Sequence, residues 1–243
     1  MKENFGEHLK IVSILEEGEL TEKIIANLES IIEKSEMIGE GGNAIVYAME
    51  EGELSGICLK RIKEVPQLKG NDIFKEHDFQ HRAREAGVET PLPILVISDE
   101  KSKILVMQRV RGASIEEILT KKKPLTENFD FEKFISKLTN SVKLLQEKAG
   151  IVHRDLKVSN VMINEKGDPV IIDFGVSGEK IGSGGEYDEL SYEENVLMFN
   201  HSTQHYQSVS GYFENDYKKI KDIKASIKSF LNQDLTNNRN MIV

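Results

Sequence analysis

One stretch in the second half of the sequence constrains the fold and the chemistry more than any other. It reads His153-Arg154-Asp155-Leu156-Lys157-Val158-Ser159-Asn160, then Val161-Met162-Ile163, a turn at Gly167-Asp168-Pro169, and Ile171-Ile172-Asp173-Phe174-Gly175. The apolar runs predict two short strands, with Asp155, Asn160 and Asp173 on the loops beside them. Such an arrangement brings oxygen ligands together. Hard divalent ions such as magnesium prefer oxygen ligands and bind well between such groups and a phosphate.

The same stretch contains the complete H-R-D-L-x-x-x-N and D-F-G pattern of protein kinases, and the chain resembles eukaryotic-like protein kinases. The resemblance implies a bilobal, α+β protein-kinase-like fold with a small β-rich lobe and a reduced helical large lobe. It implies that Asp155 accepts or orients the proton of the attacking hydroxyl. Lys157 would neutralise the γ-phosphate of ATP, as in Ser/Thr kinases, and Asn160 and Asp173 would hold Mg²⁺.

Two residues at the start of this stretch have other expected roles. His153 is expected to hydrogen-bond the Asp-Phe-Gly segment rather than to act as a base. Arg154, in its family role, would pair with a phosphorylated activation loop. Both expectations concern positioning, on which phosphoryl transfer mostly depends.

A Gly-rich segment predicts a phosphate-binding turn. It reads Ile38-Gly39-Glu40-Gly41-Gly42-Asn43-Ala44-Ile45-Val46-Tyr47. Gly39 and Gly41 let backbone amides approach phosphate oxygens that a side chain would block. The resemblance to the kinase G-x-G-x-x-G-x-V motif adds Ile38 to the nucleotide site and places Val46 over the adenine. The third glycine of that motif is Ala44 in this chain.

The next strand carries the lysine that kinases use for phosphate binding. Ile57-Cys58-Leu59-Lys60 replaces the familiar V-A-I-K, and by resemblance Lys60 reaches the α- and β-phosphates of ATP. A lysine that ends an apolar run needs a carboxylate partner. We expect that partner to be Glu76, from a helix over residues 72–86, with Asp78 and Glu85 as rivals.

A segment that resembles the kinase hinge follows at Leu105-Val106-Met107-Gln108-Arg109-Val110-Arg111-Gly112. Met107 would be the gatekeeper, and the backbones of Gln108 and Val110 would hydrogen-bond adenine. Cys58 stands where the family has a small residue beside the adenine. We interpret it as a buried, inert thiol.

Periodicity predicts the other ordered elements. We expect strands at Ile94–Ile97 and Ile104–Met107, a capping box at Ser114-Ile115-Glu116-Glu117 and a solvated loop at Lys121-Lys122-Lys123. A core helix that ends at Gly150 should follow, with an apolar stripe of Phe131, Phe134, Ile135, Leu138, Val142 and Leu145.

The family pattern fails after Gly175, because no A-P-E follows and only 68 residues remain. A Gly- and Ser-rich run contains Ser177, Ser183, Tyr187 and Ser191. We expect one helix from a second capping box at Ser191 to Asn200, another marked by Tyr217, Ile220, Ile223, Ile227 and Phe230, and a frayed tail over 232–243. A large lobe cut down in this way resembles the kinase of the KEOPS complex and the bacterial type III effector kinases of the NleH and OspG type.

The N-terminal residues predict an acidic, amphipathic extension. Helices are expected over 7–16 and 20–34, broken at Gly18, as a brace on the small lobe or as a docking segment. The expected organisation is an acidic helical extension over 1–36, a kinase N-lobe over 37–108, a reduced C-lobe over 109–231 and a flexible tail over 232–243.

Composition limits the classes of function. The formal charge of −9 argues against nucleic acid as the main partner, no apolar run is long enough for a membrane span, and a single cysteine fits a reducing compartment. We therefore expect a cytoplasmic protein kinase that uses ATP and Mg²⁺ on Ser/Thr of a protein substrate, including itself; secretion as an effector acting in a host cytosol stays open. The alternative is a kinase-fold scaffold that binds a regulatory or complex partner.

Overall fold

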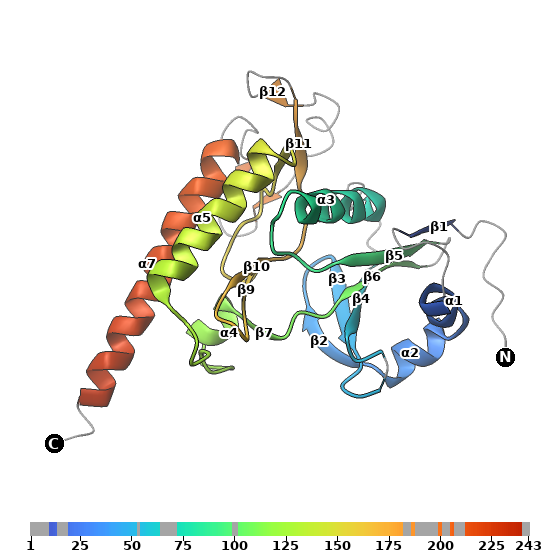
Figure 1. The fold of residues 1–243 in the computed structure, drawn as a ribbon, viewed down its shortest axis with the longest axis horizontal. Helices are drawn as coiled ribbons and strands as arrows, with labels where there is room; N and C mark the ends of the chain where they lie inside the picture. Colours follow the sequence, from blue (N-terminus) through green and yellow to red (C-terminus); the bar gives the residue numbers. More distant parts are fainter. Residues whose placement is uncertain are drawn as a thin grey trace. The chain divides into compact units, whose positions relative to one another are not determined.

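The computed structural model describes residues 10–13, 19–52, 54–63, 72–98, 102–181, 186–187, 199–200, 205–206 and 212–239. The chain divides into two compact units (Figure 1). The first unit comprises residues 1–82 and 91–109, and the second comprises 83–90 and 110–243. Within the described residues, no helix is long and apolar enough to cross a membrane.

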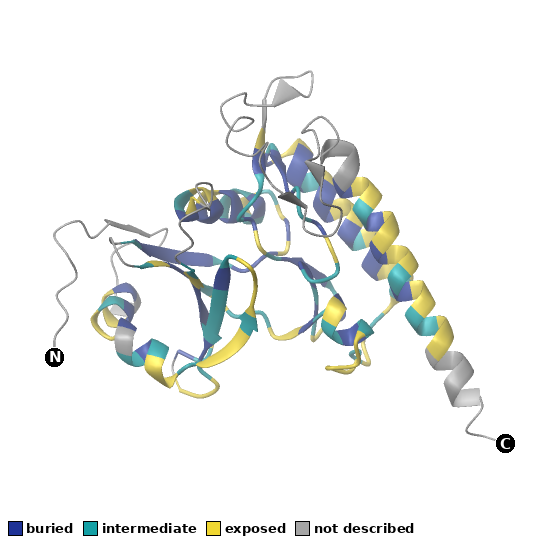
Figure 2. Ribbon diagram, turned by 180° about the vertical axis from the view of Figure 1, so that it is seen from behind, coloured by how far each residue is buried: buried dark blue, intermediate teal, exposed yellow. Residues whose placement is uncertain are grey.

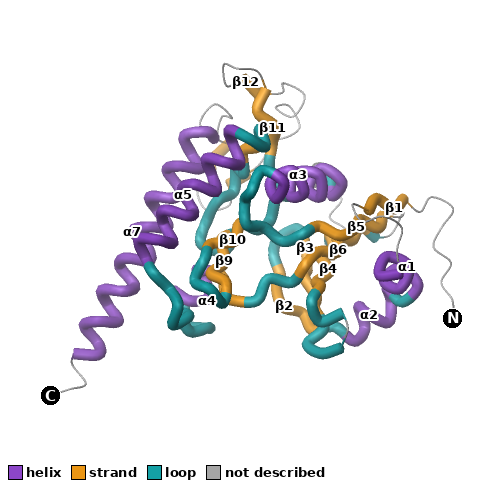
Figure 3. Tube along the Cα trace, in the orientation of Figure 1, coloured by secondary structure: helices purple, strands orange, loops and turns teal. Residues whose placement is uncertain are grey.

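The first unit is built on one antiparallel sheet of six strands. Its order is β1-β5-β6-β4-β3-β2, with β1 at Lys10–Ser13, β2 at Glu36–Glu40, β3 at Ala44–Ala48, β4 at Ile57–Ile62, β5 at Pro93–Ser98 and β6 at Lys103–Gln108 (Figure 3). The expected strands at 94–97 and 104–107 are therefore present as β5 and β6.

Helices cover both faces of the neighbouring strands β5 and β6, which explains the continuous apolar run within each of them. Alternate side chains of a strand point to opposite faces. Ile104 and Val106 of β6 pack into the cluster that includes α1 (Glu19–Ala26) and α2 (Leu28–Lys34). Leu105, between them, packs with Ile73 of α3 (Ile73–Glu85). A strand buried on both faces reads as a continuous hydrophobic run.

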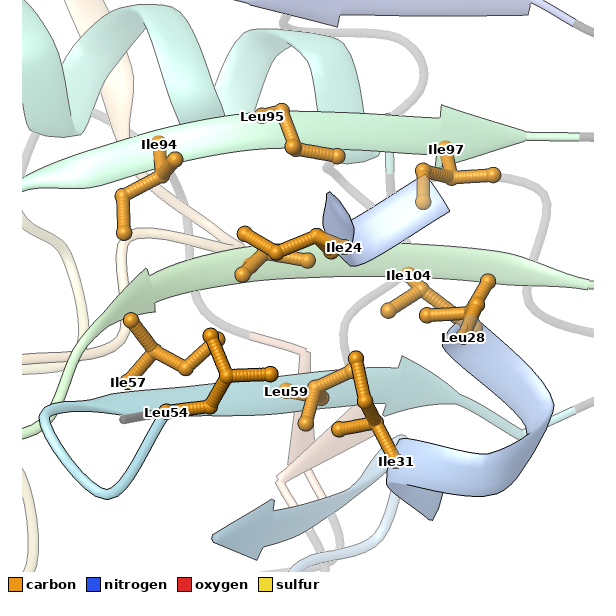
Figure 4. Packing of buried hydrophobic residues seen from close by; sticks show 11 residues of the cluster. Ile24, Leu28, Ile31, Leu54, Ile57, Leu59, Ile94, Leu95, Ile97 and Ile104 are labelled. Carbon is orange, nitrogen blue, oxygen red and sulfur yellow. The ribbon is translucent and has the colours of Figure 1, made fainter. Parts of the chain in front are cut away.

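The extension packs against the sheet as a brace. Ile24, Leu28 and Ile31 lie at helical spacing, are 0–4% exposed, and point onto the strands (Figure 4). The helical prediction for 20–34 is confirmed, with an additional break at Asn27; the break predicted at Gly18 lies outside the described residues. The helix expected over 7–16 is wrong, because Lys10–Ser13 forms the edge strand β1 and pairs with β5. Four residues rich in β-branched side chains gain more hydrogen bonds from a sheet edge than from an isolated helical turn.

The second unit carries three helices among its described residues, together with short strands. The helices are α4 at Ile115–Leu119, α5 at Phe131–Glu147 and α7 at Tyr212–Arg239. The strands are β7 at Gly112–Ser114, β8 at Ile151–Val152, β9 at Val161–Asn164, β10 at Pro169–Ile171, β11 at Gly178–Ile181, β12 at Glu186–Tyr187, β13 at Phe199–Asn200 and β14 at His205–Tyr206. They pair in the orders β10-β9-β7, β12-β11-β8 and β13-β14.

The core of this unit lies where α5 and α7 pack side by side (Figure 2). The predicted stripe on α5 is buried from Phe134 to Leu145, and Asp130 caps the helix by accepting from the amide of Lys133. Ser114 and Glu117 form the expected capping box of α4. Each cap satisfies amides that the first helical turn leaves without a partner.

Two expectations for the last third of the chain need correction. The helix predicted from Ser191 to Asn200 falls largely outside the described residues, and its end, Phe199–Asn200, is a strand that pairs with β14. α7 continues to Arg239, through most of the stretch expected as a frayed tail. The last turns of a long helix can form despite low intrinsic helix propensity, because the earlier turns are already packed and adding a turn to them is easier than starting a helix.

The brace makes a prediction about stability. Replacing Ile24, which is 0% exposed, by Ala should lower the free energy of unfolding by about 2–5 kcal/mol, because it removes buried methylene groups and leaves a cavity. Urea denaturation followed by circular dichroism measures the change. Glu22→Ala, on the exposed side of the same helix, is the control and should shift stability by less than about 0.5 kcal/mol. Equal stability of Ile24→Ala and wild type would contradict the conclusion that the N-terminal helices stabilise the sheet.

Candidate active site

The Gly-rich turn connects β2 and β3 in the first unit. The strand pairing shifts register between Met37 and Gly39, so Ile38 forms a bulge and keeps 44% of its surface exposed. The amide of Gly41 donates to the carbonyl of Ala44 at 2.9 Å and closes the tip. The turn is therefore formed with Ala44 in the place of the third glycine of the motif.

The glycines of this turn are not required by the fold. A Cβ on Gly39 or Gly41 would meet nothing closer than 3.9 Å, and one on Gly42 would point into open space. None of the three has a positive φ. The absence of side chains therefore lets a ligand approach the backbone of the turn closely, as phosphate binding requires.

A lysine holds the same turn from the end of β4. Lys63 Nζ lies 2.6 Å from Glu40 Oε1 and 2.9 Å from the carbonyl oxygen of Gly41. Its backbone amide donates to the carbonyl of Asn43 at 2.8 Å. These bonds tie three positions of the turn to the strand that carries Lys60.

Lys60 and Glu76 form a buried ion pair. Their side chains come from β4 and the first turn of α3, are 7% and 3% exposed as residues, and place Nζ 2.5 Å from Oε1. Of the three carboxylates weighed, Glu76 is the one that meets the lysine. Asp78 is exposed and pairs with Arg82 at 3.3 Å, and Glu85 is exposed at the end of the helix. Because both charged groups are buried and in close contact, the pair holds the lysine ammonium group in one place.

The hinge-like segment begins at the end of β6. The amide of Gln108 donates to the carbonyl of Leu92 at 2.8 Å, and the carbonyl of Gln108 is approached by Cys58 Sγ at 3.8 Å. Gln108 therefore has its carbonyl, not its amide, to offer to a base. Val110, the other adenine-binding residue proposed from the sequence, is half-buried and is assigned to the second unit. Met107 lies next to Gln108 on β6, half-buried.

In the second unit, Asp155, Lys157 and Asn160 form one hydrogen-bonded group. Lys157 Nζ lies 2.6 Å from Asp155 Oδ2, and Asn160 Nδ2 donates to the same oxygen and to the Asp155 carbonyl, each at 2.9 Å. The loop thus holds a carboxylate between a cation and an amide donor.

Asn160 and Asp173 fit a magnesium site. Asn160 Nδ2 donates to Asp155, while its Oδ1 accepts from Ser159 Oγ at 3.4 Å and has a second lone pair for a metal ion. The amide of Ile172, next to Asp173, donates to the Asn160 carbonyl at 3.0 Å. Asp173 is exposed and has φ of 67°. Within the described residues, no cluster of three His, Cys, Asp or Glu side chains could hold an ion alone. Magnesium here would complete its coordination with phosphate and water oxygens.

His153 is a structural residue, as the sequence suggested. It is 0% exposed, its Nε2 lies 3.1 Å from the carbonyl oxygen of Ile172, and its ring meets the Phe174 ring edge-on with centroids 5.1 Å apart. The imidazole thereby braces the residues on both sides of Asp173. The neighbouring Arg154 has φ of 65°, and a Cβ on Gly178 would overlap its guanidinium.

One residue that fixes the backbone of this loop is not among those predicted from the sequence. Asp216 on α7 is 1% exposed and accepts from the amides of His153 at 3.0 Å and Arg154 at 3.2 Å, and from Gln146 Nε2 at 3.3 Å. Burial raises the pKa of its carboxyl, against the opposing effects of His153 and these hydrogen bonds. A signal was present, because Asp216 precedes Ile220, Ile223 and Ile227 on one apolar helical face.

Comparison with known proteins fits this geometry. The family model of the protein kinase domain matches residues 32–196, which is more than half of the chain. The chain belongs to the protein kinase family. A chain in the structure of the CAK complex from Chaetomium thermophilum bound to ATP-γ-S has a similar fold, with a TM-score of 0.50 and 22% sequence identity over 69% of this kinase.

The kinase spans about half of the length of that structural relative, 53%. The match supports the kinase-like α+β fold expected from the sequence. The finer resemblance to the KEOPS-complex and type III effector kinases stays a prediction.

Asp216 should make stability depend on pH. The pKa of its carboxyl in the folded state lies above the unfolded value of 3.8, so the folded state keeps this proton to a higher pH than the unfolded state does. The contribution of this carboxyl to the free energy of unfolding therefore falls as the pH rises above about 4. Asp216→Asn lacks this titration and has one acceptor oxygen fewer, which should cost about 1–3 kcal/mol. The stability gap between wild type and variant should therefore narrow from pH 4.5 to 7.5.

Urea denaturation of both proteins across this range measures the gap, and the other carboxylates cancel in the difference. Asp222→Asn, an exposed position on the same helix, is the control. A gap that widens with pH would show that the folded carboxyl has a lowered pKa.

Cys58 should be unreactive in the folded kinase. Burial raises the pKa of its thiol to about 12, so the nucleophilic thiolate is scarce at pH 8. Ellman's reagent should modify it at least about 100-fold more slowly than in the urea-unfolded chain. Equal rates in both states would overturn the assignment of Cys58 as an inert core residue.

Proposed function

We propose that this kinase transfers the γ-phosphate of ATP, with Mg²⁺, to Ser or Thr hydroxyls of a protein substrate and of itself. The observation that carries the proposal is the group formed by Asp155, Lys157 and Asn160. A carboxylate held beside an ammonium group suits a hydroxyl nucleophile and a phosphate that arrive together.

The residues of the second unit have complementary tasks in this reaction. Asp155 takes the proton of the substrate hydroxyl as its oxygen forms a bond to the γ-phosphorus. Lys157 stabilises the negative charge on the transferring group while the bond to the β-phosphate oxygen breaks, which leaves ADP. Magnesium, held by Asn160 and Asp173 when bound, would neutralise phosphate charge.

The residues of the first unit bind the nucleotide in this proposal. Lys60, fixed by Glu76, attracts the α- and β-phosphates, and the turn at Gly39 and Gly41, which has no side chains in the way, lets phosphate oxygens approach its backbone. Ile38 and Val46 supply apolar surface for the base. This arrangement is typical of catalysis through positioning and charge.

The substrate class rests on Lys157, which lies two residues after Asp155, where Ser/Thr kinases carry it. The compartment stays a proposal, and we expect the cytoplasm. A kinase-fold scaffold that binds ATP and a partner protein is the competing function, and the experiment below separates the two.

Lys60→Ala and Asp173→Ala should each reduce phosphate transfer at least about 100-fold, because each removes charge stabilisation from the transition state. Transfer is measured with γ-labelled ATP and magnesium, with the purified kinase as its own acceptor. Lys103→Ala and Asp222→Ala, at exposed positions of the two units, are matched controls and should keep the wild-type rate. A near wild-type rate for either site variant would show that the site is wrongly assigned.

Mass spectrometry of the labelled protein, wild type beside Asp155→Ala, tests the substrate class. Label on serine between 177 and 191 in the wild type alone would support a self-phosphorylating Ser/Thr kinase. Label on tyrosine would contradict the substrate class, and bound ATP without transfer would favour the scaffold.

A further inference from the structure

An open hollow on the second unit has no part in the mechanism above. It lies between the end of α4 and α7, has a volume of about 530 Å³, and is lined by Ile118, Lys121, Lys122, Lys123, Pro124, Leu125, Phe230 and Leu231. Ile118 is buried, and Leu125, Phe230 and Leu231 are half-buried. The lining therefore offers apolar surface directly beside three exposed lysines.

The lysine run is held in place by the end of α4. The amide of Lys121 donates to the carbonyl of Ile118 at 2.9 Å, and the amides of Lys122 and Lys123 donate to the carbonyl of Glu117 at 2.8 and 3.2 Å. Lys123 Nζ also lies 3.3 Å from the Glu117 carboxylate. Because the backbone of this run is already fixed, a ligand would not have to order it on binding.

α7 extends the positive charge beyond the hollow. Three exposed lysines and one leucine follow one another at spacings of three, four and three residues, so they lie on one side of the helix. They are Lys221, Lys224, Lys228 and Leu231. Lys224 Nζ lies 5.9 Å from the centroid of the Phe131 ring at the start of α5. Since Leu231 lines the hollow, the row of lysines leads to it.

The positive charge of this row is not cancelled by carboxylates beside it. Asp222 follows Lys221 by one residue, so it points to a different side of α7, where it pairs with Lys219 at 3.8 Å. Within the part of the chain that the structure describes, Lys122, Lys221 and Lys228 have no carboxylate partner. The row and the hollow are therefore a basic surface on a chain whose formal charge is −9.

An acidic peptide segment fits this surface better than a membrane or a nucleic acid does. Exposed charges more than about 8–10 Å apart are largely screened at physiological ionic strength, so a short segment responds mainly to the lysines beside it. A membrane or a nucleic acid presents an extended anionic surface, which would also meet the negative charge of the rest of the chain. The apolar lining of the hollow suits a hydrophobic side chain, which a phosphate backbone lacks.

We propose that the hollow and the lysine row, together the α4–α7 surface, bind an acidic segment of a partner protein. An apolar side chain of the segment packs on Phe230 and Leu231, and its carboxylates pair with the lysines. The row from Lys221 to Leu231 is about 15 Å long, so about five extended residues span it. Binding here requires neither ATP nor a residue of the active site, and the proposal goes beyond the proposed phosphate transfer.

Fluorescence anisotropy with the full-length kinase and a labelled synthetic peptide, Glu-Glu-Glu-Leu-Leu-Glu-Glu-Glu, tests the proposal. The peptide should bind, and more weakly as the salt concentration rises, because salt screens the ion pairs. A peptide with serines in place of the leucines should bind at least about fivefold more weakly, because the hollow then receives no apolar side chain. A peptide with lysines in place of the glutamates should not bind. No binding of the acidic peptide, or equal binding of all three, would overturn the proposal.

Paired charge reversals locate the binding surface. Lys122→Glu combined with Lys228→Glu should weaken binding of the acidic peptide at least about tenfold, because like charges then face each other. Lys34→Glu combined with Lys103→Glu changes the net charge equally at exposed positions of the first unit, and should alter binding less than about twofold. Circular dichroism checks that both variants fold. Equal effects of the two pairs would overturn the proposal.

Vesicles that contain phosphatidylserine test the membrane as an alternative occupant. The kinase should sediment with them no more than with neutral phosphatidylcholine vesicles. Sedimentation with the anionic vesicles that the Lys122→Glu and Lys228→Glu changes abolish would overturn the proposal in favour of a membrane-binding surface. These measurements contain no ATP, so their outcome is independent of whether the kinase transfers phosphate.

Discussion

The conformation of the catalytic loop depends on one buried carboxylate. Asp216 accepts from the amides of His153 and Arg154, which lie just before Asp155. Arg154 has φ of 65°, a conformation that a side chain disfavours and that surrounding bonds must hold. The loop is therefore fixed from a helix more than sixty residues later in the sequence. This dependence explains why α7 belongs to the working part of the kinase although it lies beyond the residues that the family model matches.

The two units position their functional groups by different physical means. The first unit uses a buried ion pair, Lys60 with Glu76, whose side chains are almost fully shielded from water and lie in close contact. The second unit uses a connected set of hydrogen bonds, in which the buried Asn160 and the exposed Lys157 both donate to the half-buried Asp155. A buried pair tolerates little change, since either partner left alone is an uncompensated charge. The hydrogen-bonded loop leaves Asp155 reachable by a substrate, as a proton acceptor must be.

Local patterns predicted the parts of the structure that depend on local chemistry. The apolar stripe of α5 and the capping box at Ser114 appear where the sequence places them, because helical periodicity and amide capping act within one or two turns. The prediction failed where long-range pairing decided the outcome. Lys10–Ser13 became a strand because the edge of β5 offered it partners, and no residue within the segment signals that edge.

The sequence by itself determined the identity and spacing of the reacting groups. The residues from His153 to Gly175 form a continuous motif, and its order places Asp155, Asn160 and Asp173 on neighbouring loops. Only the tertiary structure decided which carboxylate meets Lys60, and that Asp216 holds the catalytic loop. A helical pattern shows which residues share a face, but not what that face meets, because burial and hydrogen bonding depend on partners brought together by folding.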